Sequence, residues 1–347
     1  MPILARSSES GERIGSNRAK LLLLLPPFGA LCYPFLLNAF HASLGSPGIV
    51  GAVPLILALM VPAVGVFVAL KLGAIASPTE GDLQAKRIAL LTVAVPAQFT
   101  FIGVVLTLVG DPISDVSLWV ALWGLAGIFV MLAVFSPGVR TVPTSGEISP
   151  RLRMAHGLSA AGVVLLFLAM HLSNHLSGLW SEATHRFLMD KFRLVYRAEF
   201  VEPFVVVLFL FLVVSGTMLT WSYTRRSADI YRTVQIASGV YLIFFVLGHM
   251  NSVFVYARTF LEIQTDWDFA TGAPTGLIND AWNIRLLPHY LFGVFFALTH
   301  LILGARVVAL AHSVPVTRAN SLSQIGIGVA ALIAIAIIIG MVGLHLG

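Results

Sequence analysis

The chain has 347 residues, of which 58% are hydrophobic and only 11% charged, with a formal net charge of +5. Soluble domains carry about 25% charged residues, so this composition excludes a soluble globular protein and indicates a multi-pass membrane protein. The positive charge does not indicate nucleic-acid binding, because no basic patch is interleaved with aromatic residues. The single cysteine, Cys32, excludes intrachain disulfides, iron–sulfur ligation and Cys-based zinc sites.

Nine charge-poor stretches approach the ~20 residues that a membrane-spanning helix needs. They lie at 21–43, 49–70, 88–110, 116–138, 155–178, 203–223, 233–257, 286–305 and 320–346. The sequence therefore predicts an all-α fold: a polytopic membrane helix bundle of about nine transmembrane helices.

The loop 139–153, which contains two prolines, one glycine and three arginines, divides these spans into four and five. We therefore expect a four-helix transmembrane block over 1–145 and a five-helix membrane domain over 146–347. With the N-terminus inside, most Lys and Arg residues fall in inner segments and all nine spans obey one alternation, as the positive-inside rule requires. The first 20 residues mix Arg with Glu and precede a long apolar run, so we do not expect a cleavable signal peptide.

Two outer loops are expected to be structured. Apolar residues recur at helical spacing through 181–202, with Arg and Lys between them, which is typical of an amphipathic helix in the membrane interface. Residues 259–285 look like an ordered outer loop. Trp180, Trp267 and Trp282 fit an aromatic belt at the interface.

Three apolar segments carry histidines but no Asp, Glu, Lys or Arg: 154–175, 233–257 and 286–305. An ionisable side chain in hydrocarbon costs a few kcal/mol and by default has a partner. For imidazole inside a helix bundle, the most economical partner is a metal, usually haem iron. This pattern points to electron transfer, although hydrogen bonds between helices are the alternative for each histidine.

The histidines differ in their expected depth in the membrane. At about 1.5 Å per residue, His171 and His249 both lie roughly 25 Å from the inner boundary on parallel spans. Equal depth is what one bis-histidine haem requires, so we predict that these two are the axial iron ligands. His300 lies on a span that runs antiparallel to these two, and it is expected toward the inner half of the membrane. The others are expected at span ends (His156, His175, His289) or to be solvated or interfacial (His41, His185, His312, His345).

Two small residues support the prediction of a flat cofactor such as a porphyrin. Gly293 lies on the face of its helix that carries His300, and Ser238 precedes His249 on the same span. Both would let a porphyrin approach the backbone, although small residues also serve ordinary packing between membrane helices.

Four segments carry a resemblance to a known family: HGLSAAGVVLLFLAMHLSNH (156–175), FRLVYRAEFVEPF (192–204), QIASGVYLIFFVLGH (235–249) and FGVFFALTH (292–300). Together they resemble the cytochrome b membrane subunit of succinate:quinone oxidoreductases and fumarate reductases, in its single-polypeptide, five-helix form. The resemblance covers roughly residues 150–347. The N-terminal block has no counterpart in that form; it is open whether it is a fused partner subunit, a lipid or quinone cover, or a docking surface.

The resemblance implies one haem b between His171 and His249. A second, inner haem would need His300 and a histidine near 212–215, where this sequence has none. The second haem is therefore doubtful, with His156 a possible substitute for the missing ligand. Haem b and quinone are the cofactors that the family implies.

By the same resemblance, the chain is a non-catalytic, electron-transfer subunit in a prokaryotic cytoplasmic membrane. Flavoprotein and iron–sulfur subunits would dock on its inner face, and electrons would pass through the haem to quinone. Quinone candidates on the outer side are His175, Asn174, Glu199, Glu202 and Arg197. Glu199 and Glu202 could equally be solvated, and Arg193 and Arg197 could pair with haem propionates or lipid phosphates. A homo-oligomer remains open.

The main alternative is a haem-free transporter or scaffold that uses the histidines as a proton relay. The spans show no pair of broken helices and no intramembrane Asp, Glu, Lys or Arg, which argues against a transporter. A haem-containing sensor or assembly platform is the third possibility.

Overall fold

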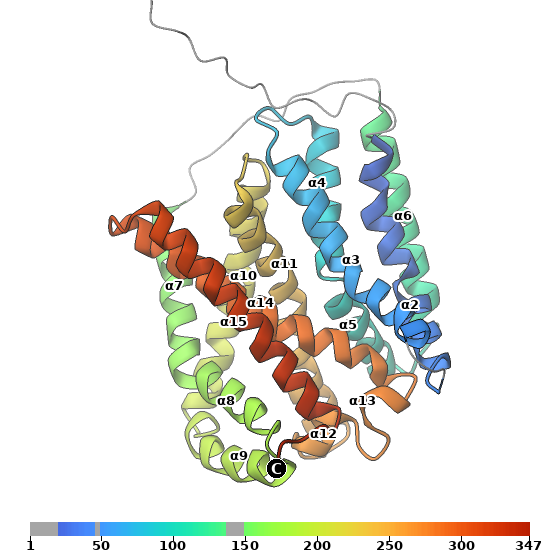
Figure 1. The fold of residues 1–347 in the computed structure, drawn as a ribbon, viewed down its shortest axis with the longest axis vertical. Helices are drawn as coiled ribbons and strands as arrows, with labels where there is room; N and C mark the ends of the chain where they lie inside the picture. Colours follow the sequence, from blue (N-terminus) through green and yellow to red (C-terminus); the bar gives the residue numbers. More distant parts are fainter. Residues whose placement is uncertain (1–19, 46–48, 137–148) are drawn as a thin grey trace, which may run out of the picture.

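The computed structural model describes residues 20–45, 49–136 and 149–347, and these residues form helices and no strands. Eight helices are long and apolar enough to cross a membrane, and one bent pair is a ninth candidate. The predicted fold class is confirmed: the protein is an all-α, multi-pass membrane bundle (Figure 1).

The first block holds the helices α2 (Leu25–Ala42), α3 (Ile49–Gly73), α4 (Glu80–Val93), α5 (Val95–Leu108) and α6 (Asp115–Phe135), with a 3-10 turn η1 (Leu22–Leu24) before α2. The second block begins with one span made of α7 (Pro150–Val163), the π-helical η2 (Val164–Leu168) and α8 (Ala169–Ser177). It continues with α10 (Val201–Thr224), α11 (Ile230–Met250) with the π-helical η3 (Asn251–Phe260), α14 (Leu286–Ala311) with η4 (Asn283–Arg285) before it, and α15 (Val316–Met341).

The third predicted span, 88–110, is not one straight helix. It consists of α4 and α5, which meet at a bend of 68°. Pro96 lies in the first turn of α5, where its ring and missing N–H prevent the helix from continuing through Ala94. Gln98 donates from Nε2 to the carbonyl of Leu91 at 2.9 Å and so satisfies one group that the break frees. The expectation of unbroken spans is therefore wrong here.

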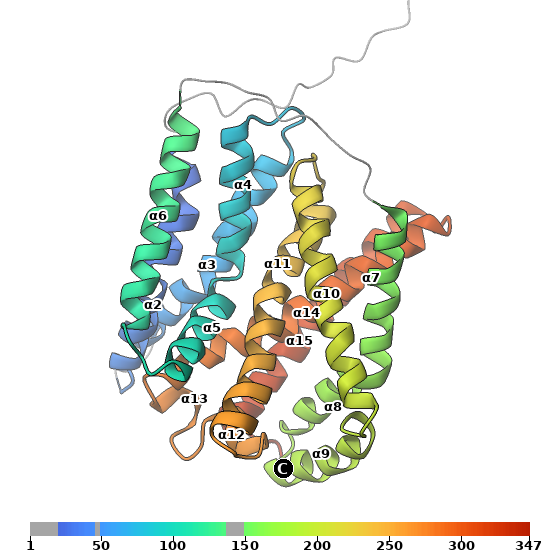
Figure 2. The same cartoon turned by 180° about the vertical axis from the view of Figure 1, so that it is seen from behind.

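Short helices gather at one end of the bundle. α9 (Glu182–Tyr196), α12 (Trp267–Thr271) and α13 (Gly276–Asn279) lie at the same end as the C-terminus (Figures 1 and 2). We call this the outer end, following the predicted orientation, and the end at which α7 and α11 begin the inner end. α9 confirms the predicted helix in 181–202. Trp180 is exposed, whereas Trp267 is buried and does not belong to an exposed aromatic belt.

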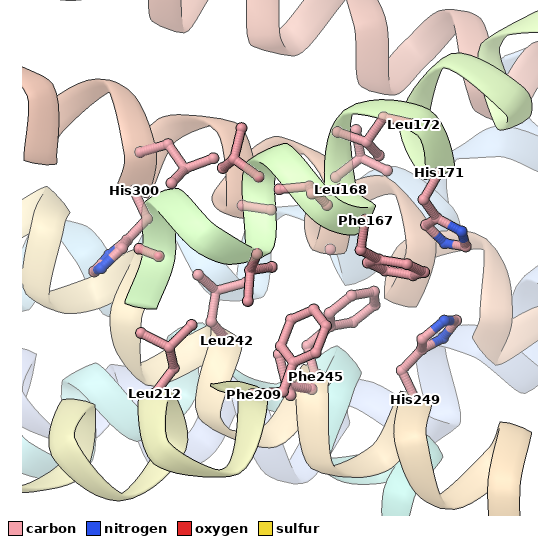
Figure 3. A pocket seen from close by; sticks show the side chains of 18 of the residues that line it. Phe167, Leu168, His171, Leu172, Phe209, Leu212, Leu242, Phe245, His249 and His300 are labelled. Atoms are coloured by element: carbon pink, nitrogen blue, oxygen red, sulfur yellow. The ribbon is translucent and has the colours of Figure 1, made fainter. Parts of the chain in front are cut away.

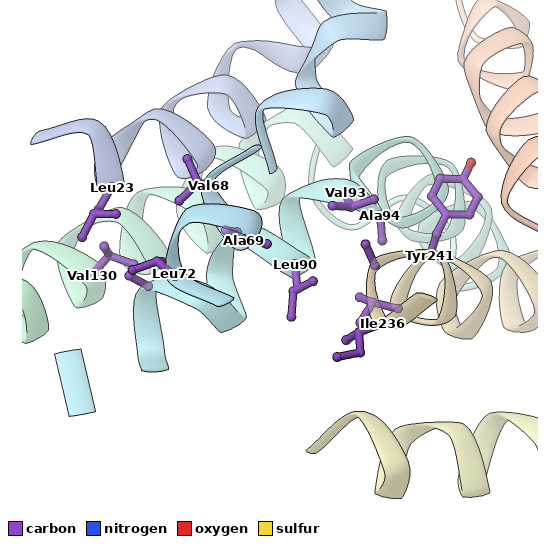
Figure 4. Close-up of a cluster of buried hydrophobic side chains, with 14 of the residues drawn as sticks. Leu23, Val68, Ala69, Leu72, Leu90, Val93, Ala94, Val130, Ile236 and Tyr241 are labelled. Carbon is purple, nitrogen blue, oxygen red and sulfur yellow. The ribbon is translucent and has the colours of Figure 1, made fainter. Parts of the chain in front are cut away.

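The two predicted blocks share one hydrophobic core. Leu72 and Leu90 of the first block pack in the same buried cluster as Ile236, Tyr241 and Phe296 of the second (Figure 4). The boundary in 139–153 is thus a division of the sequence and not a break in packing; residues 137–148 of it lie outside the described part of the chain.

A buried ion pair also joins the blocks. Nη1 of Arg285, which precedes α14, lies 2.6 Å from Oδ2 of Asp115 at the start of α6. The side chain of Arg285 is 9% exposed. The guanidinium carbon lies 4.4 Å from the ring centre of Phe99 and 4.6 Å from that of Trp282. This contact helps to fix α14, which carries His300, against the first block.

Candidate functional site

A long cavity of about 650 Å³ runs between the span α7–η2–α8 and the helices α10, α11 and α14. Ligand pockets in proteins are typically 300–1,000 Å³ and mostly apolar, as this one is. Six histidines line it: His156, His171, His175, His185, His249 and His300. Its lining reaches from Arg232 in the first turn of α11 to Arg258 near the end of η3. The cavity therefore extends along most of the membrane-spanning length of the bundle.

The structure brings the two predicted iron ligands together. His171 of α8 and His249 of α11 face each other across the outer half of the cavity, with ring centroids 6.0 Å apart (Figure 3). A metal–nitrogen bond is about 2 Å, and the imidazole centre is about 1 Å farther, so two imidazoles that share a metal have ring centroids at most about 6 Å apart. The observed spacing matches that value.

Aromatic rings position both imidazoles. Phe167 stacks on His171 at 4.6 Å and 23°, and Phe245 stacks on His249 at 5.5 Å and 11°. No hydrogen bond from the described residues engages either imidazole. Each π-helical segment also adjoins one of these histidines, since η2 ends before His171 and η3 begins after His249. Such π segments are frequent at functional sites, where they re-aim side chains.

A histidine chain continues from this pair toward the outer end. The ring centroid of His175 lies 4.6 Å from that of His171 and 5.3 Å from that of His185. The expectation that His185 is solvated is wrong: it is 2% exposed and packs on Trp267 at 4.5 Å. Asn174 donates from Nδ2 to Nε2 of His185 at 3.1 Å, as the amide is placed.

The environment of His185 favours its neutral form. Burial, followed by the positive charges of Arg186 and Arg193, lowers its pKa to about 4, which the Asp266 carboxylate only partly opposes. Nδ1 of His175 and Nδ1 of His185 are buried without a hydrogen-bond partner among the described residues. Two donors or acceptors at the outer end of the cavity therefore remain available to a ligand.

Arginines flank the outer mouth. Arg193 donates to the Thr265 carbonyl at 2.8 Å, and Arg197 donates to the Thr265 hydroxyl at 2.6 Å. Nε of Arg193 and Nε of Arg197 are both buried without a partner in the described structure. Burial, with the charges of Arg193 and Arg258 close by, lowers the pKa of Arg197. Crowded cations with unpaired buried donors suit an anionic group such as a carboxylate.

The predicted quinone residues divide into two groups. His175, Asn174, Arg197 and Glu202 line the cavity. Glu202 accepts from Nη2 of Arg258 at 2.9 Å, so it is paired and not freely solvated. Glu199 is exposed and is absent from the lining, so the structure does not bring it to the site.

The two small residues predicted to admit a cofactor have other neighbours. Ser238 is fully buried and its Oγ lies 3.1 Å from Nδ1 of His300, so it serves that histidine and not His249. The space beside Gly293 is filled, because a Cβ there would lie 2.3 Å from the ring of Phe245. Gly157 and Gly304 are the lining glycines with open space beside them.

At the inner half of the cavity lies a second histidine pair. The ring centroids of His156 and His300 are 6.3 Å apart. Ser215 contacts His156, and Ser238 contacts His300. Sequence reasoning did not single out Ser215, which carries no distinctive spacing within its apolar span.

His289 was expected near a span end, where water or headgroups would satisfy it. It is instead 3% exposed, and its ring lies 4.7 Å from that of Phe245. Its Nδ1 has no hydrogen-bond partner in the described part of the chain. It lies between the two blocks and does not line the cavity.

The fold and this site define a multi-pass helical membrane protein whose interior cavity carries paired histidines. No protein-family model, curated protein or solved structure matches the chain.

Proposed function

We propose that the chain is a membrane-bound haem b protein that transfers electrons between the haem and a quinone. The observation that carries this proposal is the facing pair His171 and His249, whose ring centroids lie 6.0 Å apart in an elongated apolar cavity. The haem would be held by these two imidazoles and would supply reversible one-electron chemistry.

The residues present fit a haem in two respects. The pair offers two nitrogens, whereas zinc sites take three or four protein ligands; a porphyrin supplies four further nitrogens around an iron. The buried, unpaired Nε atoms of Arg193 and Arg197 are donors that porphyrin propionates would satisfy. The two imidazole nitrogens and the two unpaired arginine N–H groups therefore both favour a haem as the ligand.

The chain's own residues would bind the group, exclude water and hold protons. Phe167 and Phe245 stack on the two imidazoles and fix their orientation. The apolar walls keep solvent out and so influence the iron's reduction potential. Quinone reduction takes up protons, and His175 at the outer end has a buried Nδ1 without a hydrogen-bond partner among the described residues.

The resemblance to succinate dehydrogenase and fumarate reductase anchors supports a more particular form of this proposal. In that form the chain is a non-catalytic anchor in a prokaryotic cytoplasmic membrane, and flavoprotein and iron–sulfur subunits dock on its inner face. This form depends on the four segments quoted above. Copurification with flavin and iron–sulfur proteins would distinguish such an anchor from a haem-containing sensor.

A reduced-minus-oxidised optical spectrum of the detergent-purified full chain tests the haem proposal, with haem measured per polypeptide. We expect a b-type spectrum, and a loss of haem in His171→Ala and in His249→Ala. His312→Ala is the matched control, because His312 is exposed and its Nδ1 contacts the Val308 carbonyl of its own helix. Absence of haem from a well-folded wild-type protein would overturn the proposal and favour the transporter or scaffold.

A further inference from the structure

The segment 261–266, which we call the strap, borders the outer mouth of the cavity beside α9. It joins η3 to α12 without helical structure, and its residues Thr265 and Asp266 line the cavity. We propose that the strap is a gate, that Arg193 and Arg197 hold it closed, and that an anionic ligand in the cavity strengthens this closure. The gate would control access to the facing histidine pair in the outer half of the cavity, the outer site.

Both ends of the strap are anchored. Near its start, the amide of Ile263 donates to the carbonyl of Ala257 in η3 at 3.0 Å. After its far end, Trp267 is 5% exposed and its ring centroid lies 4.5 Å from that of His185. Movement of the strap is therefore confined to the residues between Ile263 and Trp267, which are the residues that border the mouth.

The strap buries little apolar surface. Leu261 is 40% exposed and Ile263 is 44% exposed, and the side chain between Ile263 and Thr265, Gln264, is exposed as well. Segments with few buried apolar contacts open locally at a low cost in free energy. The polar contacts of the strap must therefore decide how often it opens.

Guanidinium groups supply these polar contacts. Arg193 donates from Nη2 to the Thr265 carbonyl at 2.8 Å, and Arg197 donates from Nη2 to the Thr265 hydroxyl at 2.6 Å. Arg186 adds an ion pair with Asp266 at 3.5 Å, but its side chain is 36% exposed, and ion pairs in contact with water contribute little. The two contacts to Thr265 are therefore the main clasp of the strap.

The clasp lies beside the buried face of α9. Met189 and Arg193 are four residues apart on this helix, so they share one face. Met189 is 6% exposed and lines the cavity, as does Thr265, which Arg193 holds. Release of Thr265 would open this face to water from the outer side. The accessibility of position 189 is therefore a measure of how often the strap opens.

The two clasping arginines also face the cavity. While Nη2 of each contacts Thr265, Nε of Arg193 and Nε of Arg197 are buried without a partner among the described residues. A guanidinium carries five N–H donors in one rigid plane, so it can hold the strap and a carboxylate at the same time.

This double use couples the strap to the ligand. A carboxylate bound at Nε would restrict both arginine side chains, and their contacts to Thr265 would then cost less conformational entropy. Such coupling is reciprocal, so a closed strap would raise the affinity for the ligand by the same factor. The strap would then be most firmly closed when the outer site is occupied.

The identity of the ligand rests on the proposed function, in which porphyrin carboxylates meet these donors. The clasp itself does not depend on that proposal, because Arg193, Arg197 and Thr265 all belong to the chain. The gate and its coupling to the ligand can therefore be tested by separate measurements.

Cysteine labelling of the full chain in detergent tests the clasp. In a Cys32→Ser background, which removes the only native cysteine, Met189→Cys reports opening through its rate of reaction with a water-soluble maleimide. We expect this rate to rise by at least about 10-fold when Arg193→Gln and Arg197→Gln are added, since the loss of one hydrogen bond to a charged group shifts an equilibrium by roughly that factor. Arg318→Gln, at an exposed position of α15, is the matched control. Equal rates with and without the clasp would overturn the gate.

Two further variants guard against misfolding. Thr265→Val keeps the shape of the side chain but removes the acceptor of Arg197, so we expect a smaller rise in the labelling rate of Met189→Cys. Leu277→Cys, which is 2% exposed on α13 and outside the cavity lining, should label slowly in every background. If the arginine variants also speed labelling of Leu277→Cys, they have loosened the whole outer end and Thr265→Val decides. An unchanged rate in Thr265→Val would then overturn the clasp.

Hydrogen–deuterium exchange of the strap measures its coupling to the ligand. In the full chain prepared without haem, we expect saturating haemin to slow the exchange of the amides in 262–266, and to slow it less in Thr265→Val. Unchanged exchange of the strap in protein that binds haem by its optical spectrum would overturn the coupling and leave the proposed function intact. Absence of haem binding would overturn the proposed function and the coupling together, whereas the labelling rates would still decide the gate.

Discussion

The imidazoles of His171 and His249 lie on different spans, and their ring centroids are 6.0 Å apart. Phe167 stacks on the ring of His171, and Phe245 stacks on that of His249 (Figure 3). The arrangement presents two imidazole rings to one region of an apolar cavity.

Gly293→Ala is expected to disturb the outer site through Phe245. The added methyl would lie 2.3 Å from the Phe245 ring, which must move, and that ring stacks on His249. Overpacking of this kind costs about 1–3 kcal/mol of stability. We expect a lower melting temperature and a shifted haem absorption band. Gly328→Ala has open space beside it and serves as the control; an unshifted band in Gly293→Ala would contradict the proposed contact.

Replacing Arg193 and Arg197 by Gln should weaken haem retention. Their buried, unpaired Nε donors are proposed to meet haem propionates, and hydrogen bonds to charged groups contribute about 1.5–3 kcal/mol each. The loss of one such bond corresponds to roughly 10–150-fold weaker binding. Haemin titration of the apoprotein measures it. Arg318→Gln, on α15 and outside the cavity lining, should bind as the wild type does.

Asp115→Ala is expected to destabilise the contact between the two blocks. Arg285 would remain buried with its positive charge uncompensated, and removing one partner of a buried ion pair costs about 3–5 kcal/mol. The partial exposure of Asp115, 21% at the side chain, places the expected loss at the lower limit. Thermal unfolding in detergent measures the change. Asp190→Ala, at an exposed position of α9, is the control, and equal melting temperatures for the two variants would refute the role of the pair.

Acid should destabilise the outer end through His185. Its pKa is about 4 in the folded protein and about 6.5 when unfolded, so the unfolded chain binds more protons between these values. The free energy of unfolding therefore falls as pH drops from about 6.5 toward 4, with a slope of at most about 1.4 kcal/mol per pH unit from this group. In His185→Gln the pH profile of the melting temperature should be flatter than in the wild type. Parallel profiles would contradict the burial of a neutral imidazole there.

Composition and the length of the charge-poor stretches predicted the bundle, because each span must satisfy its backbone hydrogen bonds within itself. The rise per residue also predicted that His171 and His249 share a level, since both sit on parallel spans at similar distances from their starts. Both expectations depend only on the composition of each span and on the rise per residue of a helix, which can be read from the sequence.

Contacts between distant segments could not be predicted in this way. The burial of His185 depends on α9 folding back onto Asn174 and Trp267, which no spacing within 181–202 encodes. The partnership of Ser215 with His156 likewise joins two spans. The bend between α4 and α5 had a signal in Pro96, but proline also occurs inside α2 and α3, so its presence alone did not identify the break.

Electron paramagnetic resonance of the oxidised full chain, loaded with haem, tests the central claim most directly. Two imidazole ligands give low-spin ferric iron, so we predict a low-spin signal in the wild type that is lost with the haem in His249→Ala, or is high-spin in any haem that this variant retains. His312→Ala should leave the signal unchanged. A high-spin wild-type signal, or a low-spin signal that persists unaltered in both His171→Ala and His249→Ala, would contradict iron ligation by this pair.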